Sequence, residues 1–134
     1  MEIDLPLEIK IGRKNFSLNL NFYRNAHYQT LNRMKVEFGN IVSPKLKDLP
    51  SFNSLSLTYI LYPKTKRLCD VSNVCSIVDK FFCDVLVNQS KLPDDNYQYL
   101  KHIEYKFGEV DKENPRVVVK LSGDIDDENS INRV

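Results

Sequence analysis

Acidic side chains recur along a single segment with Lys80 in its middle, and together they could bind a metal ion and act on a phosphodiester. Asp70 precedes a helix-periodic run, Lys80 and Asp84 lie one turn apart within it, and Asp94 and Asp95 follow it. Converging carboxylate oxygens are the ligands that Mg²⁺ prefers, and a nearby lysine neutralises charge on a phosphate. This segment is therefore the first candidate for a functional site.

The residues from Val71 to Asn88 have the periodicity of an amphipathic helix. Successive side chains rotate by about 100° around a helix. One broad apolar face results, formed by Val74, Ile77, Val78, Phe81, Phe82, Val85 and Leu86. Such a face must pack on another element, and we expect a sheet to receive it. Lys80 and Asp84 fall on the opposite face, and Asp79 lies on the flank.

Each acidic residue of the segment also has a purely structural explanation. Lys80 and Asp84 have the spacing of an ordinary i,i+4 surface pair. Asp70 stands where a helix N-cap would accept backbone N–H groups. Asp94 and Asp95 follow a proline and fit a turn. The case for a functional site rests on their occurring together.

Length and composition indicate one globular domain. The chain has 134 residues, of which 42% are hydrophobic and 28% charged. The net charge is +1, but residues 9–36 carry six basic and no acidic side chains, whereas residues 122–134 carry four acidic side chains and one arginine. This asymmetry is compatible with a basic face that meets phosphate and an acidic end that does not.

The cysteines argue against a zinc site. Cys69, Cys75 and Cys83 form no C-x-x-C pair, and His27 and His102 lie far from them in the sequence. Reduced thiols in an intracellular protein explain them. The longest apolar runs fall short of the roughly 18 residues that a membrane span needs. We therefore expect a cytoplasmic protein, in a bacterium or a phage-infected host, that does not contact the membrane.

The order of the expected elements predicts an α+β fold, in which a small mixed β-sheet packs against two main helices. Alternating or helical spacing predicts a strand over 2–11 with Pro6 at an edge or bulge, extended chain and an irregular loop over 14–25, a helix over 26–42, a strand over 54–62, the helix over 71–88, and strands over 99–107 and 116–121. Residues 1–121 are expected to form one domain, and residues 122–134 an acidic, flexible tail.

The segment resembles the signature region of RusA-like Holliday junction resolvases, which are small endodeoxyribonucleases often encoded by phages and prophages. That pattern has Asp-x-Asp-Asn, a lysine in the following helix, an aspartate one turn later and an Asp-Asp pair in a loop. This chain has Asp70-Val71-Ser72-Asn73, Lys80, Asp84 and Asp94-Asp95. Residues 19–24 (Asn-Leu-Asn-Phe-Tyr-Arg) are similar to the family's loop before its first helix, and the likeness spans about residues 18–121.

Two departures from the family pattern bear on activity. Ser72 replaces the second acidic residue, and one extra helical turn lies between Asn73 and Lys80. An insertion of four residues keeps Lys80 near its original face, because it rotates the helix by only about 40° beyond a full turn. Asp79 or Asp84 could supply the lost carboxylate, or the metal could be held with one ligand fewer.

The resemblance implies a Mg²⁺-dependent endodeoxyribonuclease that resolves Holliday junctions or other branched DNA by paired cleavage, acting as a homodimer, with Mn²⁺ as a substitute ion. Carried over by position, Asp70, Lys80 and Asp95 would be catalytic, and Asp70, Asp84, Asp94 and Asp95 would bind the metal. The alternative is a non-catalytic RusA-like module that binds DNA or protein, which Ser72 favours.

Binding to DNA is expected to come from basic residues outside the acidic segment. The candidates are Arg24, Asn25, His27, Arg33 and Lys35 around the loop and first helix, with Lys66 and Arg67 just before Asp70. Such side chains contact the phosphate backbone and make binding depend on salt.

Overall fold

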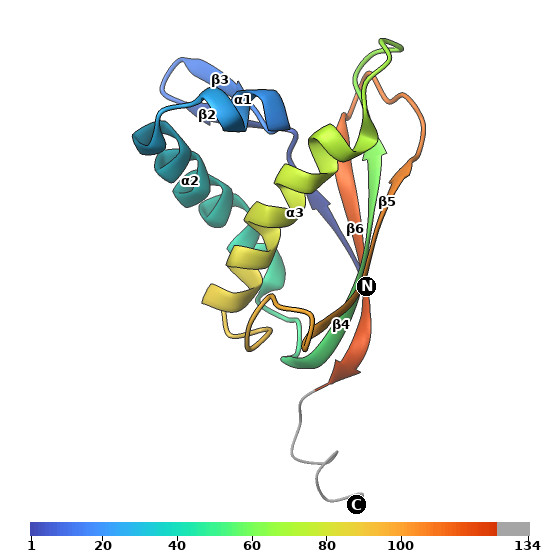
Figure 1. Ribbon diagram of the computed structural model, residues 1–134. Coiled ribbons are helices and arrows are strands. Elements are labelled where there is room, and N and C mark those ends of the chain that lie inside the picture. The colour runs from blue at the N-terminus through green and yellow to red at the C-terminus, as the bar shows by residue number, and fades with distance from the viewer. Residues whose placement is uncertain (126–134) are drawn as a thin grey trace, which may run out of the picture.

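The computed structural model of the protein describes residues 1–125 (Figure 1). Its elements in chain order are β1 (Glu2–Leu5), β2 (Glu8–Ile11), β3 (Lys14–Ser17), α1 (Leu20–Asn25), α2 (Tyr28–Leu46), β4 (Phe52–Tyr62), α3 (Val71–Asn88), β5 (Leu100–Phe107) and β6 (Arg116–Ile125). The predicted α+β class is confirmed.

The main sheet is mixed and has four strands in the order β1-β6-β4-β5, while β2 and β3 form a separate hairpin. β4 runs parallel to β5 and antiparallel to β6. Parallel neighbours need a crossover, and α3 supplies it between β4 and β5. The helices all lie on one side of this sheet, and α3 lies between the sheet and α2 (Figure 1).

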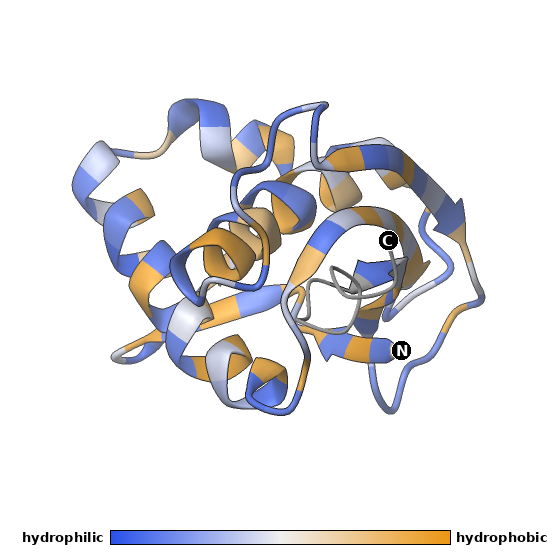
Figure 2. Cartoon of the chain, turned by 90° about the horizontal axis from the view of Figure 1, so that it is seen from below, coloured by the Kyte–Doolittle hydropathy of each residue, from blue (hydrophilic) through white to orange (hydrophobic). Residues whose placement is uncertain are grey.

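The core forms between α3 and the sheet and between α3 and α2. α3 buries the apolar face that its spacing predicts, together with both of its cysteines; the buried side chains are Cys75, Ile77, Val78, Phe81, Phe82, Cys83, Val85 and Leu86. β4 alternates buried and half-buried residues, and alternation along the strands is visible by colour in Figure 2. From α2, Phe38 meets the Phe81 ring edge-on, with the centroids 5.6 Å apart. The sheet thus receives the apolar face of α3, as predicted.

The loop expected after β3 is partly helical. α1 begins after Asn19, whose side chain accepts a hydrogen bond from the Phe22 N–H at 2.8 Å. This is an N-cap, which satisfies one of the free donors of a first helical turn. The prediction of an irregular loop was therefore wrong for residues 20–25.

The helix expected over 26–42 begins later and ends later. His27 is the N-cap of α2, and the helix continues past Pro44 to Leu46. A proline removes one helical hydrogen bond, but Leu46 is fully buried and its packing holds the last turn in place.

The strand expected over 2–11 is two strands. The chain turns at Pro6, so that β1 pairs with β6 at the edge of the main sheet and β2 pairs with β3. Pro6 lies between β1 and β2 and within neither strand, because a proline has no N–H to donate to a sheet, so the edge or bulge position expected for Pro6 was wrong.

The expected domain end at Leu121 is too early. β6 continues to Ile125 because Ser122, Gly123 and Asp124 pair with Ser56, Leu55 and Ser54 of β4. Polar strand residues carry no apolar alternation, so the sequence offered no signal for this extension. The rest of the expected acidic tail, residues 126–134, lies outside the described residues.

Candidate functional site

Asp84, Asp94 and Asp95 line one cleft between α2, α3 and the loop that follows α3. The cleft has a volume of about 620 Å³, and Lys35 of α2 is the basic side chain among the described residues that line it. Asp84 comes from the penultimate turn of α3, and the two other aspartates come from the loop. Three of the four predicted metal ligands therefore line the same cleft.

Both oxygens of Asp94 are engaged within the loop. Asp94 Oδ1 accepts a hydrogen bond from the Asp95 N–H at 2.8 Å, and Asp94 Oδ2 accepts one from the Asn96 side chain at 3.1 Å. This is the local turn chemistry that the sequence also predicted. It fixes the direction in which the Asp95 side chain leaves the loop.

The electrostatics of the cleft disfavour a third negative charge. Partial burial raises the pKa of the Asp95 carboxyl above its ordinary value, and a hydrogen bond that the protonated form donates to Asp94, together with the charges of Asp94 and Asp84, raises it further. Carboxylates that repel one another in this way are stabilised by a cation. The donor set, which consists of carboxylate oxygens, fits a hard divalent ion such as Mg²⁺.

Asp70 lies at the opposite end of α3 from this cleft. A rise of about 1.5 Å per residue separates Asp70 from Asp84 by about 21 Å along the helix. A single ion cannot touch both within one chain. Among residues 1–125, no three His, Cys, Asp or Glu side chains come together in an arrangement that would hold a metal ion.

The Asp70 side chain makes no capping hydrogen bond, although Asp70 occupies the N-cap position of α3. Its carbonyl oxygen accepts the Asn73 N–H at 3.1 Å, and the residue is exposed. The Asp70 carboxylate is therefore not the side-chain cap that its position in the sequence suggested.

Lys80 points toward α1 and not toward Asp84. Its Nζ lies 5.8 Å from the centroid of the Tyr23 ring, a distance at which the ring attracts the cation. Lys80 and Asp84 are both described residues, and they form no ion pair within 4.0 Å. The ordinary surface pair that their spacing suggested is therefore not formed.

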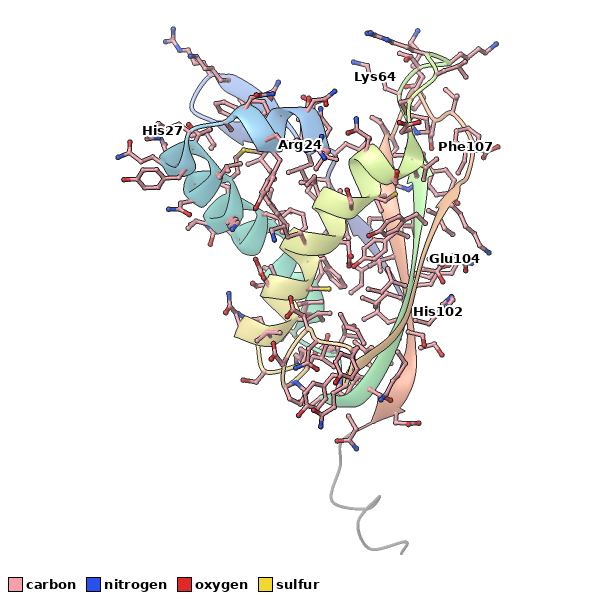
Figure 3. All side chains as sticks on the ribbon, in the orientation of Figure 1. Arg24, His27, Lys64, His102, Glu104 and Phe107 are labelled. Atoms are coloured by element: carbon pink, nitrogen blue, oxygen red, sulfur yellow. The ribbon has the colours of Figure 1, made fainter. Side chains whose placement is uncertain are left out.

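Several predicted DNA-binding residues gather at the end of the molecule where α3 begins. Arg24 lies in the last turn of α1, and His27 caps α2. Lys64, which was not among the predicted residues, lies in the connection from β4 to α3, and Figure 3 shows all three at this end. Lys66 and Arg67 continue the same exposed connection. This end, which also carries Asp70, is thus the most basic part of the site.

Some of the predicted DNA-binding residues make local contacts, and others lie elsewhere. His27 Nδ1 accepts the Gln29 N–H at 3.2 Å, and the Asn25 side chain donates to the Asn21 carbonyl at 2.8 Å. Arg33 is exposed on α2, whereas Lys35 lines the acidic cleft. A hydrogen-bonding role for His27 agrees with its position as a helix cap.

Sequence reasoning missed a carboxylate that faces the sheet. Asp79 Oδ1 accepts hydrogen bonds from Tyr59 Oη at 2.6 Å and from Cys83 Sγ at 3.2 Å, and Asp79 Oδ2 accepts one from Tyr105 Oη at 3.0 Å. Burial is the largest cause that raises the pKa of all three donors, and the charge of Asp79 raises each of them further. We call these four residues the Asp79 cluster.

The Asp79 cluster limits what can replace the carboxylate missing at position 72. Both oxygens of Asp79 are used by β4, β5 and its own helix. Asp79 therefore ties α3 to the sheet and is not placed to bind an ion in the cleft. Of the two substitutes considered for the missing acid, only Asp84 lies beside other carboxylates.

Comparisons with known proteins identify no relative: no protein-family model matches the chain, and no curated protein matches its sequence. Within residues 1–125, no helix combines the length and the apolar character needed to cross a bilayer. A function for this chain can therefore be inferred from the geometry of the site and from the resemblance of its motifs.

Proposed function

We propose that this protein is a Mg²⁺-dependent endodeoxyribonuclease of RusA-like type, which cuts Holliday junctions or other branched DNA. The observation that carries the proposal is that Asp84, Asp94 and Asp95 line one cleft, where burial first, and then the neighbouring carboxylates, raise the pKa of Asp95. A hard cation would be held there by carboxylate oxygens, with Mn²⁺ as a substitute. When bound, such an ion activates water and neutralises charge on the phosphate.

The residues of the chain itself have distinct tasks in this proposal. Lys35 lies at the wall of the cleft, where its ammonium group attracts the phosphate backbone. Lys80 stands on the exposed side of α3, held over Tyr23, and keeps its proposed role of neutralising charge on the scissile phosphate. Arg24, Lys66 and Arg67 bind backbone phosphates at the basic end and position the DNA.

The two ends of α3 contribute to one site only if two chains combine. Asp70 stands about 21 Å from Asp84 along α3, so one chain cannot place both on one ion. A homodimer whose two α3 helices run antiparallel would bring Asp70 of one chain to the cleft of the other. Two-fold symmetry would then create two equivalent sites, as paired cleavage of a two-fold junction requires.

Cleavage of a synthetic four-way junction tests the activity. The substrate is compared with linear duplex, in Mg²⁺ and in EDTA, for the wild type, Asp95→Asn and Asp70→Asn. Asp48→Asn, an exposed acid outside the site, is the matched control. We expect paired, metal-dependent nicks in the junction that both site variants lose and the control keeps. Cleavage by Asp95→Asn at the wild-type rate would remove the cleft from the mechanism.

Mixing the two inactive variants tests whether the site is shared between chains. In a mixed dimer of Asp70→Asn and Asp95→Asn, one shared site is intact and the other has lost both residues. Random assembly then restores about a quarter of the wild-type sites. A site built within one chain stays inactive in every combination, so absence of any recovery refutes sharing.

The second candidate is a RusA-like module that binds branched DNA without cutting it. Ser72 is exposed in the first turn of α3, and the Asp79 cluster leaves Asp79 unable to replace the missing acid. Ser72→Asp separates the candidates. Tight junction binding with no cleavage by either the wild type or Ser72→Asp supports the module, whereas Mg²⁺-dependent cleavage by the wild type refutes it.

A further inference from the structure

An apolar pocket lies at the end of α3 opposite the acidic cleft. It has a volume of about 290 Å³ and forms between the connection from β4 to α3, the first residue of α3 and the end of β5. Its volume is at the lower limit for a ligand site, so it has room for one or two side chains and not for a large cofactor. Five of its lining side chains are apolar: Pro63, Leu68, Val71, Phe107 and Val110.

Main-chain hydrogen bonds hold one wall of this pocket in place. The Gly108 N–H donates to the Leu61 carbonyl at 2.8 Å. The Asp111 N–H donates to the Pro63 carbonyl, also at 2.8 Å. The segment between these two bonds carries Val110 and is thereby fixed against the end of β4. The pocket is therefore formed before a ligand arrives, which lowers the entropy lost on binding.

Three apolar side chains around the pocket are exposed to solvent. Leu68 is 97% exposed, Phe107 57% and Val110 36%. They are three of the nine large apolar side chains that are exposed within residues 1–125, and all three line this pocket. Leu61, the partner of Phe107 on β4, is buried, so the apolar layer of the sheet reaches solvent here. Apolar residues that gather in one place on a surface mark an interaction site, whereas single ones do not.

The charged side chains that line the pocket, Lys66 and Arg67, are both basic. Lys64 precedes them in the same exposed connection, and Figure 3 shows Lys64 at this end of the sheet. Among residues 1–125, no ion pair within 4.0 Å includes any of these three cations. Two exposed acids, Asp70 and Glu109, are near in the sequence but do not line the pocket. The pocket therefore combines an apolar floor with positive charges that the chain itself does not pair.

We propose that this pocket docks an acidic peptide segment of another protein, which inserts a side chain of the size of leucine or phenylalanine. The inserted side chain packs against Phe107 and Val110, and its burial supplies most of the affinity. Carboxylates of the segment pair with Lys66 and Arg67, and the planar guanidinium of Arg67 can bind a carboxylate through two parallel hydrogen bonds. These pairs orient the segment and select against basic partners.

DNA accounts for only half of this surface. Backbone phosphates explain Lys66 and Arg67 but gain nothing from an apolar floor. A base stacked on Phe107 would bury its polar edge against Pro63 or Val110, and a polar group without a hydrogen-bond partner is costly to bury. An acidic peptide satisfies both halves of the site, because it carries charge and an apolar side chain in one segment.

Peptide docking would also affect the proposed nuclease. Lys66 and Arg67 are the residues proposed to bind backbone phosphates, so the peptide and DNA would compete for them. The acidic cleft would stay open, because the two pockets share no lining residue among the described ones. This competition alone rests on the proposed function, whereas the docking does not.

Fluorescence polarisation with labelled peptides tests docking to the full chain. The probes are short peptides in which a run of aspartates and glutamates precedes each pairwise combination of Leu, Ile, Phe and Trp. We expect binding below about 1 mM, and binding roughly tenfold weaker or worse when Asn and Gln replace the acids or when Ser replaces the apolar pair. Absence of binding by the whole set, or equal binding by the matched peptides, overturns the proposal.

Variants of the protein locate the contacts. Lys66→Glu/Arg67→Glu should weaken binding of the acidic peptide roughly tenfold or more, and should gain binding of the peptide in which lysine replaces each acid. Val110→Asp should weaken binding of both peptides, because it places a charge in the apolar wall. Lys101→Glu, near the start of β5, and Ile41→Asp, an exposed apolar residue of α2, are the matched controls. Far-UV circular dichroism checks that each variant is folded, and folded variants that bind like the wild type overturn the proposal.

Cys69 reports whether the peptide occupies this pocket. It lines the pocket and is exposed, whereas Cys75 and Cys83 are buried. Saturating peptide should slow the reaction of Cys69 with a thiol reagent in the wild type, and the same concentration should slow it less in Val110→Asp. A bound peptide that leaves this rate unchanged lies elsewhere on the protein and overturns the assignment.

Duplex and junction DNA, measured with the same variants, separate docking from the nuclease. If Lys66→Glu/Arg67→Glu loses DNA binding and no peptide of the set binds the wild type, the pocket belongs to the DNA surface and docking is refuted. If peptides bind but junctions are neither bound nor cut, the nuclease is refuted and docking stands. If both bind but the peptide does not displace DNA, only the competition is refuted.

Discussion

Replacing Asp79 by alanine removes the acceptor of three hydrogen bonds that join α3 to the sheet and to its own next turn. The partners are Tyr59, Tyr105 and Cys83. Two of these bonds connect α3 to β4 and β5, and these contacts lie between residues far apart in the sequence. The substitution therefore tests whether a polar cluster, and not only apolar packing, holds the crossover helix on the sheet.

The cost of Asp79→Ala follows from what its partners can do without it. Tyr59 is 0% exposed, so its hydroxyl is left without a partner, which costs about 1–3 kcal/mol. Tyr105 is half-buried and can turn its hydroxyl toward water, so its loss is smaller, about 0.5–1 kcal/mol. The thiol of Cys83 is a weak donor. We expect the free energy of unfolding to fall by about 3 kcal/mol.

A double-mutant cycle measured by urea denaturation isolates the contact. Tyr59→Phe alone is expected to cost about 1.5 kcal/mol, and the same change in Asp79→Ala about 0.5 kcal/mol or less, because the orphaned hydroxyl is then removed. Asp84→Ala, which removes a half-buried carboxylate of the same helix that faces the cleft and not the sheet, is the control and should change stability by less than about 0.5 kcal/mol. A cost below about 1 kcal/mol for Asp79→Ala, or equal effects of Tyr59→Phe in both backgrounds, would refute the reasoning.

Three further predictions concern pH, backbone packing and DNA. Burial raises the pKa of Tyr59 and Cys83 above their ordinary values of 10.0 and 9.0, so the folded state favours their protonated forms. The contribution of these two groups to the free energy of unfolding is complete below about pH 9. It is lost as the pH rises, at about 1.4 kcal/mol per pH unit for each group. Urea titrations from pH 8 to 11 check this, and a flat profile would contradict it. Gly123→Ala places a Cβ 2.0 Å from the Ser54 carbonyl oxygen, whereas the Cβ of Gly39→Ala meets nothing within 4 Å. Gly123→Ala should destabilise the protein by about 2–4 kcal/mol, and Gly39→Ala should stabilise it by about 0.5–1 kcal/mol. Equal melting temperatures of the two variants would refute the close approach at Gly123. Arg24→Ala should weaken junction binding and reduce the salt slope by about 1, and an unchanged slope would remove Arg24 from the DNA surface.

The sequence by itself determined the elements whose patterns are complete within one short window. The helix predicted over 71–88 is α3 with the same bounds, and the strand predicted over 54–62 lies within β4. The periodicity of α3 is strong because an apolar face recurs over five turns, and nothing outside the segment competes with it. Likewise, the polar turn at Asp94 and Asp95 depends on contacts between near neighbours.

Elements with weaker local patterns depended on contacts elsewhere in the chain. α1 is too short to show a period, and its signal was the single cap at Asn19. The end of β6 is polar, and it forms a strand only because β4 lies beside it. Leu46 holds the last turn of α2 through burial, which overrides the usual effect of Pro44.

For the candidate site, the sequence determined which residue types were present and only the tertiary structure decided which of them meet. Helical periodicity placed Asp79 on a flank, but the tyrosines that bind it come from two strands, 20 and 26 residues away in the sequence. The Asp70-to-Asp95 segment is continuous in sequence, yet a rigid helix separates its two ends by about 21 Å. Helical periodicity specifies the direction in which a side chain points around the helix axis. Which residues the side chain then contacts depends on how the helix packs on the strands beneath it.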